Sequence, residues 1–189
     1  YYYDDFQNEE IIRRIAEKCY LPANRTILEM IKSSGGKFKV AFSISGVALE
    51  QMEIYTPEVI DSFKELAATG NVEFLSETYA HSLSSLGDVD EFKHQIEKQE
   101  DKIKTLFGVK PSVFRNTELI YSDDISEVVY GMGYKGMLTE GAKHILGWKS
   151  PNYMYSSSVQ PKLQLLLKND RFSEDISDRF SNYGWNEYP

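Results

Sequence analysis

The sequence predicts an α/β domain in which helices alternate with parallel strands that can close into a barrel. Runs of alternating apolar and polar residues recur along the chain, and most are followed by a stretch with the apolar spacing of a helix. The connections between successive strands are mostly a dozen residues or longer, as parallel pairing requires. The chain has 189 residues, of which 41% are hydrophobic, so it can bury a core of its own. We therefore expect one domain over residues 1–189.

The first segment predicts a long helix and the first strand. Acidic residues open a helix over about 5–30, with a break expected near Pro22. Alternating apolar residues over 38–44 predict the strand, which we expect to run into a loop at Gly46.

Two further helices flank the second strand. A helix is predicted from Pro57 to Gly70, with Thr56 as its cap and an apolar face made of Val59, Ile60, Phe63 and Leu66. The apolar run 72–75 predicts the strand. The stretch 88–108 predicts a long helix with a charged, solvated outer face and an apolar inner face made of Phe92, Ile96, Ile103 and Leu106.

The remainder of the chain repeats this alternation. A helix over 122–133 is expected to be capped by Ser122 or an adjacent aspartate, and 140–152 is expected to be a loop. The other predicted elements are short strands near 113–114, 134–139, 153–155 and 163–167, a helix over about 173–180 and a final loop over 182–189.

Composition and charge narrow the classes of function. The formal net charge of −8 disfavours nucleic acid as a partner, because binding phosphates needs a basic surface. No apolar run approaches the ~20 residues that span a membrane, and the first residues lack the pattern of a signal peptide. We therefore expect no membrane contact and a cytoplasmic location. The single cysteine, Cys19, excludes a disulfide framework, and its spacing after Ile15 favours a buried position.

Three predicted strands end in reactive side chains. The loops after the carboxyl ends of parallel strands meet at one rim of a barrel, so we expect these side chains to gather there. They are Ser45 after the first strand, Glu77 and His81 after the second, and Glu118 after the third. Arg115 lies close to Glu118 in sequence, and its fixed positive charge could hold that carboxylate ionised. The alternative is that Glu118 is an ordinary surface or capping residue.

The histidines raise the question of a metal site. His81 lies four residues after Glu77, but His94 falls on the long solvated helix and His144 lies elsewhere in the chain. Because no two histidines have the spacing of ligands on one helix, we expect no metal and no cofactor. His81 is expected either to bond substrate hydroxyls or to be a structural histidine.

One segment resembles a known enzyme family. Residues 113–121, VFRNTELIY, are similar to the segment that carries the nucleophilic glutamate in the α-amylases of glycoside hydrolase family 57. Residues 70–83, GNVEFLSETYAHSL, resemble the strand of that family with a glutamate and a substrate-side histidine, which map onto Glu77 and His81. The runs 42–51, FSISGVALEQ, and 138–151, LTEGAKHILGWKSP, resemble further stretches of these enzymes, so the resemblance covers essentially the whole chain.

The resemblance implies an incomplete parallel (β/α) barrel of the glycoside hydrolase/deacetylase type, (β/α)7-like. It implies that Glu118 is the nucleophile of a retaining double displacement on α-1,4-glucans such as starch, glycogen and maltooligosaccharides. The residues expected to bind the substrate are Ser45, Glu77, Tyr79, His81, Arg115 and Trp148. The two aromatic rings in this set would stack on sugar rings. For Trp148 the alternative is packing under its own loop.

Two features of the family are absent from residues 1–189. They are the first strand with its His-Gln-Pro motif and the later strand whose Asp-x-Glu context carries the general acid. We therefore expect this chain to be a fragment of a longer protein. Its general acid, an aspartate, would lie outside the chain, and the isolated chain would be inactive.

Other functions remain open on the same barrel. A 4-α-glucanotransferase differs only in whether a sugar or water resolves the glycosyl intermediate. An inactive α-amylase-like protein would bind glucan without cleaving it. A metal-dependent polysaccharide deacetylase would need an aspartate and two histidines as ligands, which the sequence does not bring together. In the first two cases the partner is an α-glucan, and the sequence does not indicate an oligomeric state.

Overall fold

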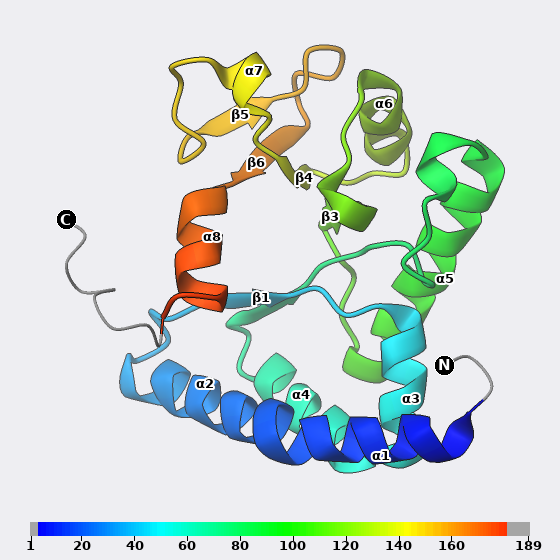
Figure 1. The fold of residues 1–189 in the computed structure, drawn as a ribbon, viewed down its shortest axis with the longest axis vertical. Helices are drawn as coiled ribbons and strands as arrows, with labels where there is room; N and C mark the ends of the chain where they lie inside the picture. The colour runs from blue at the N-terminus through cyan, green and yellow to red at the C-terminus, as the bar shows by residue number, and fades with distance from the viewer. Residues whose placement is uncertain (1–3, 181–189) are drawn as a thin grey trace. The chain divides into compact units, whose positions relative to one another are not determined.

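The computed structural model describes residues 4–180, and its backbone contacts divide the chain into two compact units, residues 1–112 and 113–189 (Figure 1). Each unit has its own sheet, two-stranded in the first and four-stranded in the second. The α/β class and the parallel pairing that the sequence predicts are confirmed. The single domain and the closure of the strands into a barrel stay predictions.

The first unit begins with a continuous helical rod. Helix α1 (Asp5–Ile15) passes through a π-helical turn (Ala16–Tyr20) into α2 (Leu21–Ser33) (Figure 1). The break predicted near Pro22 is thus a widened turn and not an interruption. Pro22 falls in the first turn of α2, where a proline is tolerated, and the π-helical turn precedes it.

Cys19 is exposed, so the expectation that it is buried is wrong. The buried stripe of the rod runs through Ile12, Ala16 and Asn24, and Tyr20 packs against the core between the last two. These positions are four residues apart, and Cys19 lies one position off the stripe.

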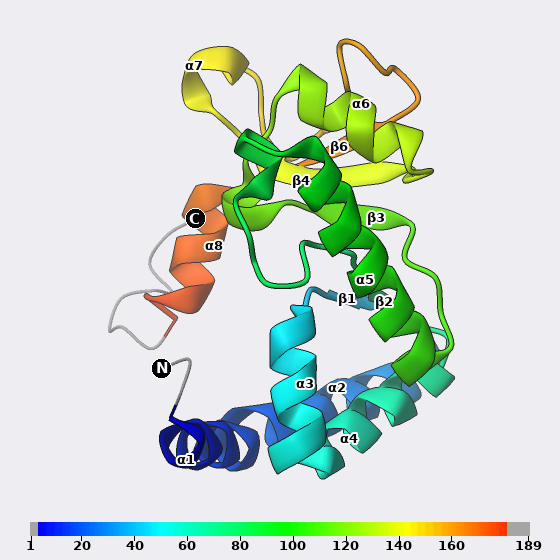
Figure 2. The ribbon, with the colours of Figure 1, turned by 90° about the vertical axis from the view of Figure 1, so that its right-hand side faces the viewer.

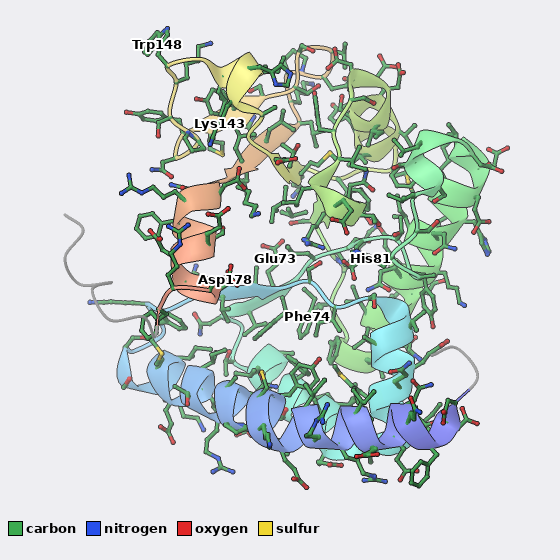
Figure 3. All side chains as sticks on the ribbon, viewed as in Figure 1. Glu73, Phe74, His81, Lys143, Trp148 and Asp178 are labelled. Atoms are coloured by element: carbon green, nitrogen blue, oxygen red, sulfur yellow. The ribbon has the colours of Figure 1, made fainter. Side chains whose placement is uncertain are left out.

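Strands β1 (Val40–Phe42) and β2 (Val72–Phe74) pair in parallel in the first unit. Successive side chains of β2 point to opposite faces, so Phe74 lies toward the helices while Glu73 lies on the other side (Figure 3). Phe74 stacks on Phe107 with the ring centroids 4.1 Å apart. The core of this unit therefore lies on the helical side of β2.

Two helices, α3 (Gly46–Tyr55) and α4 (Pro57–Ala68), connect these strands and contact one another (Figure 2). The loop predicted at Gly46 is wrong, because this residue begins α3. The apolar residues of α3 are spread around the helix, so the one-sided spacing that reveals a helix is missing. Thr56 occupies the cap position of α4, but its side chain makes no capping bond. The buried face of α4 is the predicted one, Val59, Ile60, Phe63 and Leu66.

Helix α5 (Val89–Phe107) is the last element of the first unit. Asp88 caps it by accepting hydrogen bonds from the backbone N–H groups of Asp90 and Glu91, each 3.0 Å long. Gly108 ends the helix with a φ of 70°, which favours glycine. Of the predicted inner residues, Phe92, Ile96 and Ile103 are buried, and Leu106 is half-buried against the core.

The sheet of the second unit has the strand order β3-β4-β6-β5. Its strands are β3 (Val113–Arg115), β4 (Gly136–Glu140), β5 (Met154–Ser156) and β6 (Gln164–Lys168). Strand β5 pairs antiparallel with β6, so the prediction that every strand runs parallel is wrong for β5. Only residues 157–163 separate the two strands, which is too short for the crossover that parallel strands need.

The helices of the second unit are α6 (Asp123–Gly131), α7 (Lys143–Leu146) and α8 (Asp170–Ser177). Ser122 caps α6, as predicted, by accepting a 3.2 Å hydrogen bond from the Ile125 N–H. Helix α7 lies within the predicted loop 140–152. Helix α8 begins before the predicted position because Asn169 caps it, and the predicted loop 182–189 lies outside the described residues. No helix within residues 4–180 has the length and apolar character needed to cross a membrane.

Candidate active site

Glu118 lies on a left-handed turn at the carboxyl end of β3. Strand β3 ends at Arg115, and a short 3-10 helix (Thr117–Leu119) follows. Glu118 has φ 54° and ψ 19°, and Leu119 has φ 55°. Residues with a Cβ avoid this region, and such strain concentrates at functional sites. The Glu118 side chain is exposed, so the turn presents a carboxylate where a ligand can reach it.

A pocket of about 760 Å³ lies in the second unit beside this turn. Leu119 and Tyr121 line it from the segment after β3, and Thr139 and Glu140 line it from the end of β4. His144 of α7 adds an imidazole. Tyr121, Thr139 and Glu140 thus lie at or just after the carboxyl ends of two neighbouring parallel strands, where α/β enzymes bind their ligands.

Hydrogen bonds fix one polar wall of the pocket. The Ser158 hydroxyl donates a 2.7 Å bond to Oδ1 of Asp123, and the Tyr121 hydroxyl donates a 3.1 Å bond to the same oxygen. The Tyr121 oxygen also lies 3.3 Å from Oγ of Ser157. These bonds hold the Asp123 carboxylate in the wall.

Glu77 is buried in the first unit, just after β2. Its side chain is 3% exposed, and Ser43, which follows β1, donates a 2.9 Å hydrogen bond to its Oε2. A buried carboxylate needs such a partner. Glu77 therefore lies at the predicted strand end, with its carboxylate bonded to the residue that follows the neighbouring strand.

His81 is exposed on the loop after β2 and has a φ of 52° (Figure 3). Its backbone N–H donates a 3.0 Å bond to the Thr78 carbonyl, and the Thr78 hydroxyl accepts a 2.8 Å bond from the Ser82 N–H. The non-glycine residues with positive φ in the described part of the chain are His81, Glu118 and Leu119. All three lie in loops that the sequence predicts to carry chemistry.

Within residues 4–180, no three His, Cys, Asp or Glu side chains are grouped to hold a metal ion.

Tyr79 is buried, with 5% of its surface exposed. Its hydroxyl donates a hydrogen bond to the Glu50 carboxylate, and Nζ of Lys98 lies 3.8 Å from the ring centroid. Burial raises the pKa of Tyr79, and the hydrogen bond and negative charge of Glu50 raise it further. The enclosure of this ring argues against the predicted stacking on glucose.

The other residues expected to bind substrate have different settings. The Ser45 hydroxyl caps α3 by accepting a 3.3 Å bond from the Ala48 N–H. Arg115 is the half-buried last residue of β3. Trp148 is 94% exposed on the loop after α7 (Figure 3), so it does not pack under that loop, and its stacking on sugar stays a prediction.

The predicted site residues divide between the two units. Ser45, Glu77, Tyr79 and His81 belong to the first unit, and Arg115, Glu118 and Trp148 belong to the second. Their meeting at one rim stays a prediction. The sequence did not identify Thr139 or Glu140 as pocket residues. Arg115, the last residue of β3, pairs with Leu138 of β4. Thr139 is the next residue of β4, so this register places it beside the segment that follows β3.

Comparison with protein families gives a match over the whole chain. The family model described as "Glycosyl hydrolase family 57" matches residues 1–189. A protein of Methanocaldococcus jannaschii, described provisionally as an alpha-amylase, is 47% identical over 189 residues. That match covers 100% of this chain and 40% of the relative, so the chain spans less than half the relative's length.

Solved structures with low sequence identity share the fold. A 4-alpha-glucanotransferase from Thermococcus litoralis matches with a TM-score of 0.76 at 17% identity, over 90% of this chain and 27% of that one. A branching enzyme of glycoside hydrolase family 57 from Thermococcus kodakaraensis matches with a TM-score of 0.73 at 14% identity, over 93% of this chain and 45% of that one.

Proposed function

This chain belongs to glycosyl hydrolase family 57, and we propose that it supplies the nucleophile of an α-amylase-type enzyme acting on α-1,4-glucans. Starch, glycogen and maltooligosaccharides are the substrates of this class. Glu118 carries the proposal, because it is an exposed carboxylate on a strained turn beside a pocket. It also lies within the segment that resembles the nucleophile segment of the family. The 47% identity to a relative described provisionally as an alpha-amylase supports hydrolysis.

In the proposed reaction, a carboxylate oxygen of Glu118 attacks the anomeric carbon while the glycosidic bond breaks. A general acid protonates the departing oxygen, and a glycosyl ester of Glu118 forms. Water then attacks the same carbon and gives its proton to the conjugate base of that acid, which releases the sugar with retained configuration and restores both the acid and the carboxylate. A retaining enzyme needs its second carboxyl group about 5 to 5.5 Å from the first, and we assign that group to an aspartate outside residues 1–189.

A second candidate is transfer of the glycosyl group to another sugar. It is favoured by the fold that this chain shares with a 4-alpha-glucanotransferase and a branching enzyme. Analysis of the products of a maltooligosaccharide separates the two reactions. Hydrolysis adds one reducing end per turnover, whereas transfer makes longer or branched chains with no net gain. A protein that only binds glucan would retain the oligosaccharide and form no product.

The test of the proposal is Glu118→Gln in the full-length protein. This change keeps the shape and hydrogen bonding of the side chain but removes the nucleophilic anion. The kcat on maltooligosaccharides should fall by several powers of ten while KM changes little, because the lost interaction belongs to the transition state. In Glu118→Ala, which leaves room for a small anion, added azide should restore turnover and give a product of inverted configuration.

Glu127→Gln is the matched control, because Glu127 is an exposed glutamate on α6 of the same unit. Its kcat and KM should stay at the values of the unmodified enzyme. A near-normal kcat in the Glu118→Gln enzyme would show that the nucleophile lies elsewhere.

A further inference from the structure

The turn that carries Glu118 has two consecutive residues in the left-handed region. Glu118 has φ 54° and Leu119 has φ 55°. Glycine adopts this conformation readily, but a residue with a Cβ does so only where the surrounding structure holds it there. Glu118 and Leu119 therefore need hydrogen bonds from neighbouring residues to hold them in the left-handed conformation.

Asn116 supplies the first of these bonds. It follows directly after β3, is 0% exposed, and donates from Nδ2 to the carbonyl oxygen of Ile120 at 3.0 Å. This bond connects Asn116, which precedes Glu118 and Leu119 in the chain, to Ile120, which follows them. The Leu119 N–H adds a 3.0 Å bond to the carbonyl of Asn116, which closes the turn.

Thr139 supplies the second bond, from the neighbouring strand. The register that pairs Arg115 with Leu138 brings Thr139 level with Asn116 at the carboxyl end of the sheet. Thr139 is 2% exposed, and its hydroxyl donates to the carbonyl oxygen of Leu119 at 3.2 Å. The turn is thus held by the residue that follows β3 and by a residue of the adjacent strand β4.

We infer that Asn116 and Thr139 are positioning residues for the Glu118 carboxylate, an inference that rests on the proposed function. Both bonds fix carbonyl groups just after Glu118, so they set the direction in which its side chain leaves the turn. A nucleophile must approach the anomeric carbon along a narrow path, and small displacements lower the rate strongly. Loss of either bond should therefore slow the formation of the glycosyl ester.

The test uses Thr139→Val, which removes the hydroxyl and keeps the shape of the side chain. In the full-length enzyme its kcat should fall by about tenfold or more with KM little changed, as expected for a misplaced reacting group. Thr139→Ser, which keeps the hydroxyl, should restore most of the rate. Asn116→Ala, which removes the other bond, should lower kcat in the same way.

Thr56→Val is the matched control, because Thr56 is also fully buried but its hydroxyl makes no hydrogen bond. Its kcat should not change. A second measurement follows covalent labelling of Glu118 by an activated glycosyl fluoride, with mass spectrometry as the readout. Labelling should slow in Thr139→Val and Asn116→Ala, including at temperatures where thermal unfolding shows that each variant is folded.

The outcomes separate this inference from the proposed function. If Thr139→Val and Asn116→Ala unfold at lower temperature but label Glu118 at the original rate, their role is structural and the inference is wrong. If Glu118→Gln is inactive while both variants keep their kcat, the inference fails and the proposed function stands. If Glu118→Gln keeps its kcat, the proposed function fails and the inference fails with it.

Discussion

At the scale of single residues, the buried hydroxyl of Tyr79 couples stability to pH. Burial and Glu50 raise its pKa in the folded chain above the ordinary value of 10.0. Above pH 10, the unfolded chain releases this proton while the folded chain keeps it, so the free energy of unfolding falls as the pH rises. Tyr79→Phe removes the group that titrates. Its free energy of unfolding, measured with urea on both sides of pH 10, should fall less steeply above that pH.

Tyr153→Phe is the control for this measurement, because Tyr153 is 71% exposed. Its alkaline slope should match that of the unmodified chain. At neutral pH, Tyr79→Phe should lower the free energy of unfolding by about 1.5–3 kcal/mol, since the hydrogen bond to the charged Glu50 carboxylate is gone. If the alkaline slope of Tyr79→Phe were unchanged, the Tyr79 hydroxyl would titrate in the folded chain as it does in the unfolded one.

Residue types at strand ends predicted where reactive groups lie, but not their surroundings. Glu77, His81 and Glu118 each fall in the predicted loop after a strand. The burial of Tyr79 depends on side chains from two helices, so no local pattern reveals it. The bond from Thr139 to the Glu118 turn depends on the register of β3 and β4, which the sequence alone does not fix.

At the scale of elements, the junction of α3 with the loop after β2 depends on one glycine. Gly46 begins α3, and the Val47 N–H of the same turn donates a 3.2 Å bond to the Tyr79 carbonyl. A Cβ at Gly46 would lie 2.2 Å from the Tyr79 ring. Gly46→Ala should therefore lower the free energy of unfolding by about 1–3 kcal/mol or more, as overpacking does. Urea unfolding of the purified variant measures the loss.

Gly131→Ala is the matched control, because a Cβ at this end of α6 meets nothing within 4 Å. Alanine favours a helix over glycine, so this variant should be as stable as the unmodified chain or more stable. The loss in Gly46→Ala should shrink when Tyr79→Ala is added, because the ring that causes the clash is then absent. Equal losses with and without the ring would assign the effect to the backbone instead.

Elements with a cap and a one-sided apolar face were predicted well. Helices α4, α5 and α6 all begin where a capping residue, or a proline after one, marks the start. Helix α3 lacks that one-sided pattern, and α7 is a single turn in a segment that reads as a loop. The direction of β5 is set by the short link to β6 and not by its own residues.

At the scale of the whole molecule, the alternation of strands and helices predicted the α/β class. Long connections between successive strands favour parallel pairing. The parallel pairs are β1 with β2, β3 with β4, and β4 with β6. Barrel closure requires pairing between the two sheets, and alternation along the chain does not specify it. The alternation of strands and helices likewise does not identify the general acid, which we assign to an aspartate outside residues 1–189.

Because we assign the general acid to a residue outside residues 1–189, we can predict how the isolated 189-residue chain behaves. The oxygen that leaves from a glucan is a poor leaving group without a proton, so Glu118 alone should not cleave maltooligosaccharides at a measurable rate. The isolated chain should give no new reducing ends, while the full-length protein assayed in parallel should. Circular dichroism and thermal unfolding would establish that the isolated chain is folded. Turnover that Glu118→Gln abolishes would show that an acid lies within these residues, and Glu140, which lines the pocket beside the Glu118 turn, would be the first to replace.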